Sequence, residues 1–362
     1  MRKKKILSIL NPFDELVSRK TLRVNPTIPP KRSVPERSVI SVFEYNAEGV
    51  TIENPERIED CFKYLNTDRI SWINIDGLIK SEVDAICEHF GVHPLIAEDI
   101  FSSGQRPKMD ELNQLLFSLL NMLFYDVEKN VVEAEQISVI LGPNFVLSFQ
   151  EDAKRDLFDP LREKIKVKGS KLRISGADYL FYSLIDLIVD RYFLIMESLG
   201  DKIEGLEDDI THHPDTRTLA KINYMRKEMI FLKRNISPVR EMINGILRSE
   251  NNLIEHRTEK YFKDVYDHIV QANELAENYR DMMINLQDLY LSNVNLKMNE
   301  VMKVMAVVTC LLAPATVIGG IFGMNFSKIP WADNPVGFYL AVAIMLLVPI
   351  IMVYIFRKRG WF

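Results

Sequence analysis

The chain has 362 residues, a length typical of about two domains, with a net charge of −5 and a hydrophobic content of 47%. These averages conceal a segregation, because the chain is rich in charge before about position 300 and mostly apolar after it. The three cysteines, Cys61, Cys87 and Cys310, lie far apart without a CxxC pair, which argues against a disulfide framework or a structural zinc site and fits a reducing cytoplasm.

Residues 1–37 are predicted to form an extended, mobile N-terminal arm. The chain begins with a basic run and a short apolar stretch, which Asn11 and Pro12 interrupt before it reaches the length of a signal-peptide core. Several prolines then follow between positions 23 and 37, where they favour extended backbone. We therefore expect no signal peptide, and we expect the bulk of the chain to stay on the side of the membrane where it is made.

Residues 38–180 are predicted to form an α/β domain, because short apolar runs alternate with turns and helical patterns. Gly142-Pro143-Asn144 separates two of the runs and is typical of a hairpin turn, and residues 80–90 have a helical pattern. Nothing in this region resembles a catalytic constellation. The expected strands are 38–45, 71–75, 115–125, 136–141 and 145–149.

Residues 181–257 are predicted to form a helical hairpin. A helical pattern begins near Ala177, becomes acidic toward its end, turns at residues 212–215 and continues as a basic helix. Opposite charges favour antiparallel pairing of the two helices, and the alternative is two separately solvated faces. The acidic residues are Asp201, Glu204, Glu207, Asp208 and Asp209, and the basic ones are Arg217, Lys221, Arg226, Lys227, Lys233 and Arg234.

A long helix is predicted over residues 258–322, because no glycine or proline occurs between Ile246 and Ala313. Its last part, 301–322, and a second segment, 337–356, are apolar, and Lys303 is the only charge in either of them. At about 1.5 Å per residue, each segment is long enough to cross a hydrocarbon core of about 30 Å. A pair of buried core helices is the alternative.

The distribution of basic residues predicts the orientation of the two spans. The tail, 357–362, begins with Arg357-Lys358-Arg359, whereas the loop between the spans, 323–336, holds only Lys328 and Asp333 as charges. Positive charge stays in the cytoplasm. We therefore expect a multi-pass protein of the cell (inner) membrane with both termini in the cytoplasm and the loop outside.

One stripe of the long helix stays polar and continues into the first span as small or weakly polar residues. The alternatives are a solvated face and a helix-packing face. A 3.5-residue period keeps a stripe on a common axis, so we interpret it as the wall of a water-filled path. Two helices cannot enclose a pore, which predicts a ring-shaped homo-oligomer. The stripe comprises Asp264, Asp267, Gln271, Glu274, Asn278, Asp281, Asn285, Asp288, Ser292, Asn295, Asn299, Met302, Ala306, Thr309, Ala313, Thr316 and Gly320.

Gly323-Met324-Asn325, at the end of the first of two C-terminal spans, resembles the motif of the CorA family of divalent metal ion transporters. The order of the regions agrees, with an α/β domain, a long helix and then the spans. Further stretches that resemble the family are His93–Ile100, Tyr182–Asp186, Asp264–His268 and Asn299–Val304. Together they cover nearly the whole chain after the arm.

The resemblance implies a funnel-shaped homopentamer that passes Mg2+, and often Co2+ or Ni2+. It implies that Gly323, Met324 and Asn325 form the selectivity filter, where amide carbonyls can hydrogen-bond the waters of hydrated Mg2+. Met302 and Met305 resemble the hydrophobic gate, or ordinary packing residues. The implied pore lining is Asp288, Asn299, Met302, Met305, Ala306, Thr309, Ala313, Thr316 and Gly320.

The resemblance also implies regulatory metal sites between neighbouring cytoplasmic domains. The matching residues are Asp99 with Asp264, and Glu98 with Asp186 at a second position. Two carboxylates that face each other across an interface repel, and a bound divalent ion turns that repulsion into attraction. High internal Mg2+ would then favour the closed state.

Some positions depart from the family pattern. Phe322 stands where the family often has tyrosine, and Ala313 stands where some relatives have a bulky pore residue. In the outer loop, Lys328 replaces an acidic residue that is common soon after the motif, so Asp333 is its only carboxylate. The change in the outer loop reduces the expected attraction of cations to the outer mouth, Ala313 predicts a weaker gate at its position, and Phe322 is expected to anchor the loop as tyrosine would.

The function expected from these features is passive, Mg2+-gated uptake of divalent ions, driven by the membrane potential. No GxxxxGK[ST] phosphate loop occurs, so nucleotide hydrolysis is not expected to drive transport. We also expect no organic cofactor, no enzymatic activity, and membrane lipid but not nucleic acid as a partner. One alternative is a zinc or cobalt transporter of the same architecture, and another is a membrane-anchored cytoplasmic metal sensor. His89 and His93 lack the glutamate of HExxH, which argues against catalytic zinc.

Overall fold

The computed structural model describes residues 35, 37–102, 104–126, 131–212, 215–325, 329–331 and 334–360, apart from the side chains of Lys154 and Pro335. Most of the predicted arm, and Lys328 and Asp333 of the outer loop, lie outside the described residues. The chain divides into two units. One holds the residues up to 209 together with 215–286, and the other holds 210–214 together with 287–362.

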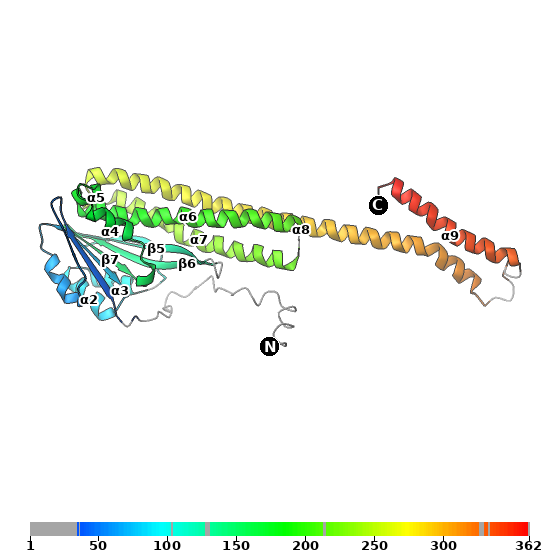
Figure 1. Ribbon diagram of the computed structural model, residues 1–362, viewed down its shortest axis with the longest axis horizontal. Coiled ribbons are helices and arrows are strands. Elements are labelled where there is room, and N and C mark those ends of the chain that lie inside the picture. Colours follow the sequence, from blue (N-terminus) through cyan, green and yellow to red (C-terminus); the bar gives the residue numbers. More distant parts are fainter. Residues whose placement is uncertain are drawn as a thin grey trace. The chain divides into compact units, whose positions relative to one another are not determined.

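Seven strands form one sheet within the described part of the first unit, in the order β2-β1-β3-β7-β6-β5-β4 (Figure 1). The pair β3/β7 is parallel and the other pairs are antiparallel. Strands form at all five predicted places, whereas β2 and β4, which are short and lie at the two edges, were not predicted. The strands are β1 (Val39–Tyr45), β2 (Val50–Glu53), β3 (Ile70–Asp76), β4 (Lys108–Leu112), β5 (Leu115–Asp126), β6 (Val131–Leu141) and β7 (Phe145–Gln150).

One face of the sheet packs against η1 (Ile58–Tyr64), α2 (Lys80–His89) and α3 (Pro94–Phe101). Alternate residues of neighbouring strands, such as Ile73 and Leu147, point into this core, as the two-residue period of a strand requires. The helix predicted at 80–90 is therefore present as α2, and it buries its apolar side against the sheet.

The other face lies against helices that follow the sheet in the chain. Tyr192 on α6 (Ala177–His212) donates to the carbonyl of Asn121 on β5 at 2.7 Å, and Asn235 on α7 (Thr216–Arg248) accepts from the Asn121 amide at 2.9 Å. The short elements η2 (Ala153–Arg155), α4 (Asp159–Lys166) and α5 (Lys171–Ile174) connect β7 to α6. The predicted boundary between residues 180 and 181 falls inside α6, because this helix begins directly after Gly176.

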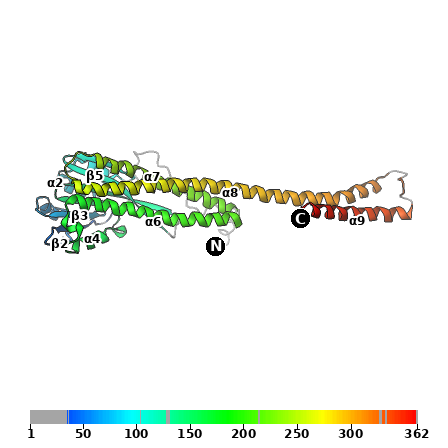
Figure 2. The same cartoon turned by 90° about the horizontal axis from the view of Figure 1, so that it is seen from above.

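Helices α6 and α7 run antiparallel, as the charge pattern predicts (Figures 1 and 2). Lys221 Nζ lies 2.6 Å from Asp209 Oδ2, so the acidic end of α6 does pair with the basic start of α7. Asp215 caps α7 by accepting a hydrogen bond from the Thr218 backbone N–H at 2.8 Å.

Helix α8 (His256–Phe322) begins two residues before the predicted Thr258. Its first part packs against α6 and α7, with the Phe181 and Phe262 rings 6.0 Å apart and Ser237 Oγ donating to Asn273 Oδ1 at 2.8 Å. The buried residues of this part recur at helical spacing along one side, which leaves the opposite side open.

In the second unit, α9 (Pro335–Lys358) runs antiparallel to the end of α8 (Figure 2). Lys303 Nζ donates to the carbonyl of Gly360 at 3.4 Å near one end of the pair. Both helices are long and apolar enough to span a membrane, and only 6% and 11% of their most apolar windows are buried within the chain. Helix α9 extends the predicted span at both ends, because Asn334 caps it, Pro335 starts it and the first basic residues of the tail continue it.

Glu135 on β6 gives the first unit a pH-dependent stability. Burial, more than any other influence, raises the pKa of this carboxyl to about 7, although its Oε1 accepts N–H groups of Glu151 and Asp152 at 3.0 and 2.8 Å. The folded chain therefore holds a proton that the unfolded chain releases, so stability falls as pH rises from about 4.5 to about 7.

Glu135→Gln is expected to raise the free energy of unfolding by at most about 2–3 kcal/mol above pH 7 and to leave it nearly unchanged near pH 4.5. Thermal unfolding of the full chain in detergent with EDTA, followed from pH 4.5 to 8, measures the difference. Glu241→Gln, at an exposed position on α7, should produce no such pH-dependent gap. If the difference in stability between Glu135→Gln and the unmodified protein were the same at every pH, it would not come from protonation of Glu135.

Candidate ion pathway and cytoplasmic metal cluster

Every polar position of the predicted stripe on α8 is exposed, from Asp264 through Asp288 to Asn299. The buried residues of the same stretch, such as Val265, Ile269 and Leu286, face α6 and α7 from other sides of the helix. Packing within the chain therefore leaves the polar stripe uncovered, which is required of any surface that lines a path between several copies.

The membrane half of the stripe is exposed as well. The residues concerned are Met302, Met305, Ala306, Thr309, Ala313, Thr316 and Gly320. The partly or fully buried positions of this half are Lys303, Val307, Leu311, Pro314, Ala315 and Ile318, and all but Ala315 recur every three or four residues along another side of the helix. The hydroxyls of Thr309 and Thr316 donate to the carbonyls four residues earlier at 2.9 and 3.1 Å, so their oxygens remain available as acceptors on the exposed side.

The predicted filter residues lie directly after α8. Gly323 N–H donates to Gly319 O at 3.0 Å, which closes the last turn, and a Cβ at position 323 would lie 3.1 Å from the same oxygen. Met324 and Asn325 follow as exposed residues outside the helix. The loop returns through Trp331, whose φ is +71°, and a Cβ on Gly337 would meet the carbonyl oxygen of Trp331 at 2.2 Å, so glycine is needed there.

Of the two predicted acidic ligands on α3, Glu98 and Asp99, only Asp99 is hydrogen-bonded by side chains in the described structure. His93 and Pro94 start the helix, since the His93 ring accepts from the Leu95 N–H and proline fits the first turn. Glu98 is exposed, whereas the Asp99 carboxylate accepts from Lys108 at 2.5 Å and from Gln105 at 3.0 Å.

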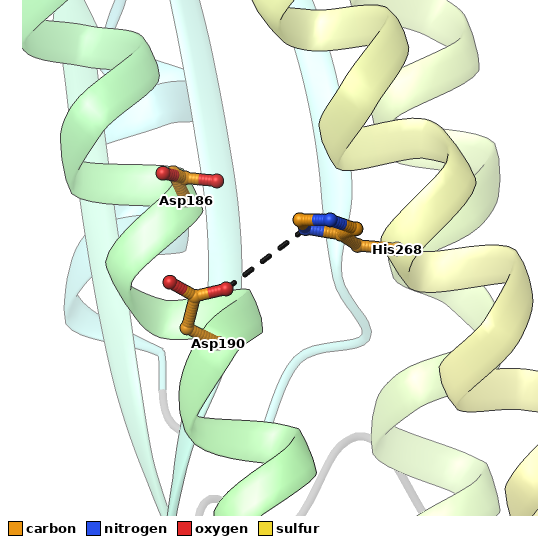
Figure 3. A group of neighbouring side chains, drawn as sticks. All are labelled: Asp186, Asp190 and His268. Carbon is orange, nitrogen blue, oxygen red and sulfur yellow. Dashed lines mark ion pairs between the residues drawn. The ribbon is translucent and has the colours of Figure 1, made fainter.

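A cluster of possible metal ligands joins α6 to α8 (Figure 3). Asp186 and Asp190 project from α6 toward His268 on α8, and one ligand atom of each lies within 4.8 Å of the others. His268 Nδ1 lies 3.9 Å from Asp190, and its Nε2 lies 4.0 Å from Asp264. Through His268, the structure brings the predicted residues Asp186 and Asp264 into one neighbourhood.

The electrostatics of this cluster favour a cation. Burial first, and the neighbouring Asp190 carboxylate second, raise the pKa of Asp186, while the Tyr182 hydroxyl donates to it at 3.0 Å. With metal–ligand bonds of about 2.1 Å, a divalent ion could reach all three side chains after small movements and relieve the repulsion between the two carboxylates. An imidazole ligand would also suit Co2+ or Ni2+ better than Mg2+.

The sequence interpretation missed Asp190 and His268 as members of this cluster. The signal was available, because Asp190 follows Asp186 by one helical turn, as His268 follows Asp264. What the sequence could not supply was the contact between α6 and α8 that brings the two pairs together.

Known proteins resemble this chain over most of its length. The family model described as "CorA-like Mg2+ transporter protein" matches residues 67–358. The cobalt/magnesium transport protein CorA of Thermotoga maritima is 38% identical over 89% of this chain and 92% of its own length. The putative metal ion transporter YfjQ of Bacillus subtilis is 28% identical over 80% of this chain and 89% of its own.

Among solved structures, the complete CorA magnesium transporter from Methanocaldococcus jannaschii is similar, with a TM-score of 0.73 and 23% identity, over 91% of this chain and all of that one. The fold is therefore that of a full-length CorA. The end of α8 and α9 are its two membrane spans, the α/β unit lies in the cytoplasm, and the family is one of transporters rather than enzymes. This chain belongs to the CorA-like Mg2+ transporter family.

Proposed function

We propose that several copies of this chain form a passive channel that admits divalent cations, Mg2+ foremost and Co2+ and Ni2+ with it. The observation that carries this proposal is the exposed stripe on α8, which is polar from Asp264 to Asn299 and continues into the span, after Met302, as small or weakly polar residues up to Gly320. A solvated face alone would explain its cytoplasmic half, but polar and small residues inside the bilayer are expected where lipid is excluded.

The membrane potential suffices as the energy source. A potential of 100 mV contributes about 2.3 kcal/mol per charge, and hence about 4.6 kcal/mol for a divalent ion. The proposed path therefore needs no nucleotide hydrolysis.

The residues of the path receive distinct roles in this proposal. Asn325 forms an outer ring of amides that holds the hydrated ion by its waters, with Gly323 and Met324 shaping the backbone around it. Met302 and Met305 form an apolar constriction, and Thr316, Asn299 and Asp288 offer oxygen atoms farther in. Most of the apolar surface of α8 and α9 is not buried within the chain. This surface supports a homo-oligomer embedded in membrane lipid, which we propose to be a pentamer.

The cytoplasmic acids regulate the path in this proposal. Asp99 meets Asp264 of a neighbouring copy, and Glu98 meets Asp186 at a second position, so that bound Mg2+ bridges the copies and favours closure. The cluster of Asp186, Asp190 and His268 supports cation binding on this side of α8, because its carboxylates already repel each other within one chain.

Flux into liposomes tests the proposed function. Purified protein in liposomes should pass Mg2+ when an inside-negative potential is imposed, without ATP, and the flux should fall as Mg2+ inside the compartment facing the α/β unit rises. Zn2+ flux in place of Mg2+ flux would favour the zinc-transporter alternative. Absence of flux of both ions, with retained metal binding, would favour the membrane-anchored sensor.

A further inference from the structure

Both oxygens of the Asp99 carboxylate are already occupied by donors from the same chain. Gln105 Nε2 donates to Oδ1 at 3.0 Å, and Lys108 Nζ lies 2.5 Å from Oδ2. The Asp99 side chain is only 18% exposed and that of Lys108 is 35% exposed, so this ion pair is shielded from water better than a surface pair. Each oxygen has a further lone pair, but a divalent ion that approaches Asp99 meets the positive charge of the Lys108 ammonium.

The backbone around Asp99 is held rigidly while its side chain is engaged. Gln136, buried on β6, donates its amide to the carbonyls of Asp99 and Ile100 at 3.1 and 3.3 Å. These carbonyls belong to the last turn of α3, where no helical N–H reaches them. Metal binding at Asp99 must therefore be accommodated by the side chains that contact it rather than by movement of the helix.

Lys108 has a second carboxylate within reach. Its Nζ lies 3.1 Å from Asp110 Oδ2, and Asp110 is two residues farther along β4, on the same side of the strand. The register places Lys108 opposite Leu119 and Asp110 opposite Phe117, both of which point into the core that α3 covers. The Lys108 ammonium therefore lies between two carboxylates at the edge of this core.

We propose that Lys108 is a tethered cation that contacts both Asp99 and Asp110 when no divalent ion is bound and is held by Asp110 alone when one binds, so that it sets the ion concentration at which the Asp99 site fills. This inference rests on the proposed regulatory role of Asp99. Since Asp110 receives the displaced ammonium, metal binding leaves no unpaired charge at the edge of the sheet. The exchange weakens the site for every cation, which suits a sensor of an abundant ion more than a high-affinity store.

The test measures the Mg2+ concentration that gives half-maximal protection of the full-length protein, in detergent, against limited proteolysis. Lys108→Met removes the competing charge and should lower this midpoint about fivefold, the equivalent of an ion pair at the strong end of the measured range. Asp110→Asn removes the second position of the ammonium and should raise the midpoint about twofold.

The double variant separates the proposed exchange from a general effect of nearby charge. If Asp110 acts through Lys108, Asp110→Asn should have no effect in the Lys108→Met background. If the two charges merely change the local potential, their effects should add, and additivity would overturn the proposal. Lys63→Met is the matched control, since it breaks a lysine–carboxylate pair of 2.7 Å with Glu53 elsewhere in the same unit and should not move the midpoint.

Asp99→Asn distinguishes failure of this inference from failure of its premise. A shifted midpoint in Asp99→Asn together with an unshifted midpoint in Lys108→Met would overturn the role of Lys108 and leave the regulatory site in place. An unshifted midpoint in Asp99→Asn would remove the site itself and the inference with it. Thermal unfolding in EDTA identifies any variant whose protease sensitivity comes from lost stability.

Discussion

Asn325→Ala is expected to reduce Mg2+ flux through the protein in liposomes by about tenfold or more, because one hydrogen bond of about 1.4 kcal/mol is already worth a factor of ten. Each copy in the proposed ring would lose the amide that bonds the waters of the hydrated ion. Asn325 is exposed immediately beyond the end of α8. Flux of Mg2+ at a fixed potential measures the effect.

Two further variants sharpen this prediction. Asn325→Asp should bind the ion more strongly and release it more slowly, so that flux falls although apparent affinity rises. Cys310→Ala, an exposed position of the same span outside the proposed lining, should leave flux unchanged and so controls for assembly. Mg2+ flux and selectivity like those of the unmodified protein in Asn325→Ala would remove Asn325 from the filter.

Asp264→Ala is expected to raise the Mg2+ concentration needed for protease protection by about tenfold or more, since the number of charged ligands sets the affinity of oxygen sites for such ions. The Asp264 side chain is 65% exposed on α8, lies 4.0 Å from His268 and repels the Asp186 carboxylate. Its loss should therefore cost little folding stability. Flux in liposomes should also persist at Mg2+ concentrations on the cytoplasmic side that close the unmodified channel.

An exposed carboxylate without a proposed role supplies the control for this change. Glu241→Ala, on α7, should leave both the protection midpoint and the closure of the channel unchanged. Equal Mg2+ protection of Asp264→Ala and the unmodified protein would argue against a metal site at this position, whatever happens to flux.

Local patterns were sufficient for most of the elements. The apolar runs of β1, β3, β5, β6 and β7, the charge change between α6 and α7, and the uninterrupted stretch of α8 each bear a signal that depends only on neighbouring residues. The polar edge strand β4 has no such signal, because Lys108–Leu112 is held by pairing with β5 rather than by its own composition. The resemblance to the CorA family rested on short motifs and on the order of the α/β domain, the long helix and the two spans.

The candidate sites divide in the same way. Sequence alone determined that a polar stripe runs along one helix from Asp264 into the first span, because helical periodicity places those residues on one side whatever surrounds them. Only the tertiary structure decided that packing leaves this side uncovered, that Asp190 and His268 join Asp186, and that Lys108 occupies Asp99. Those relations join residues far apart in the chain, and they depend on how α6 packs against α8 and how β4 pairs beside α3, which no local pattern encodes.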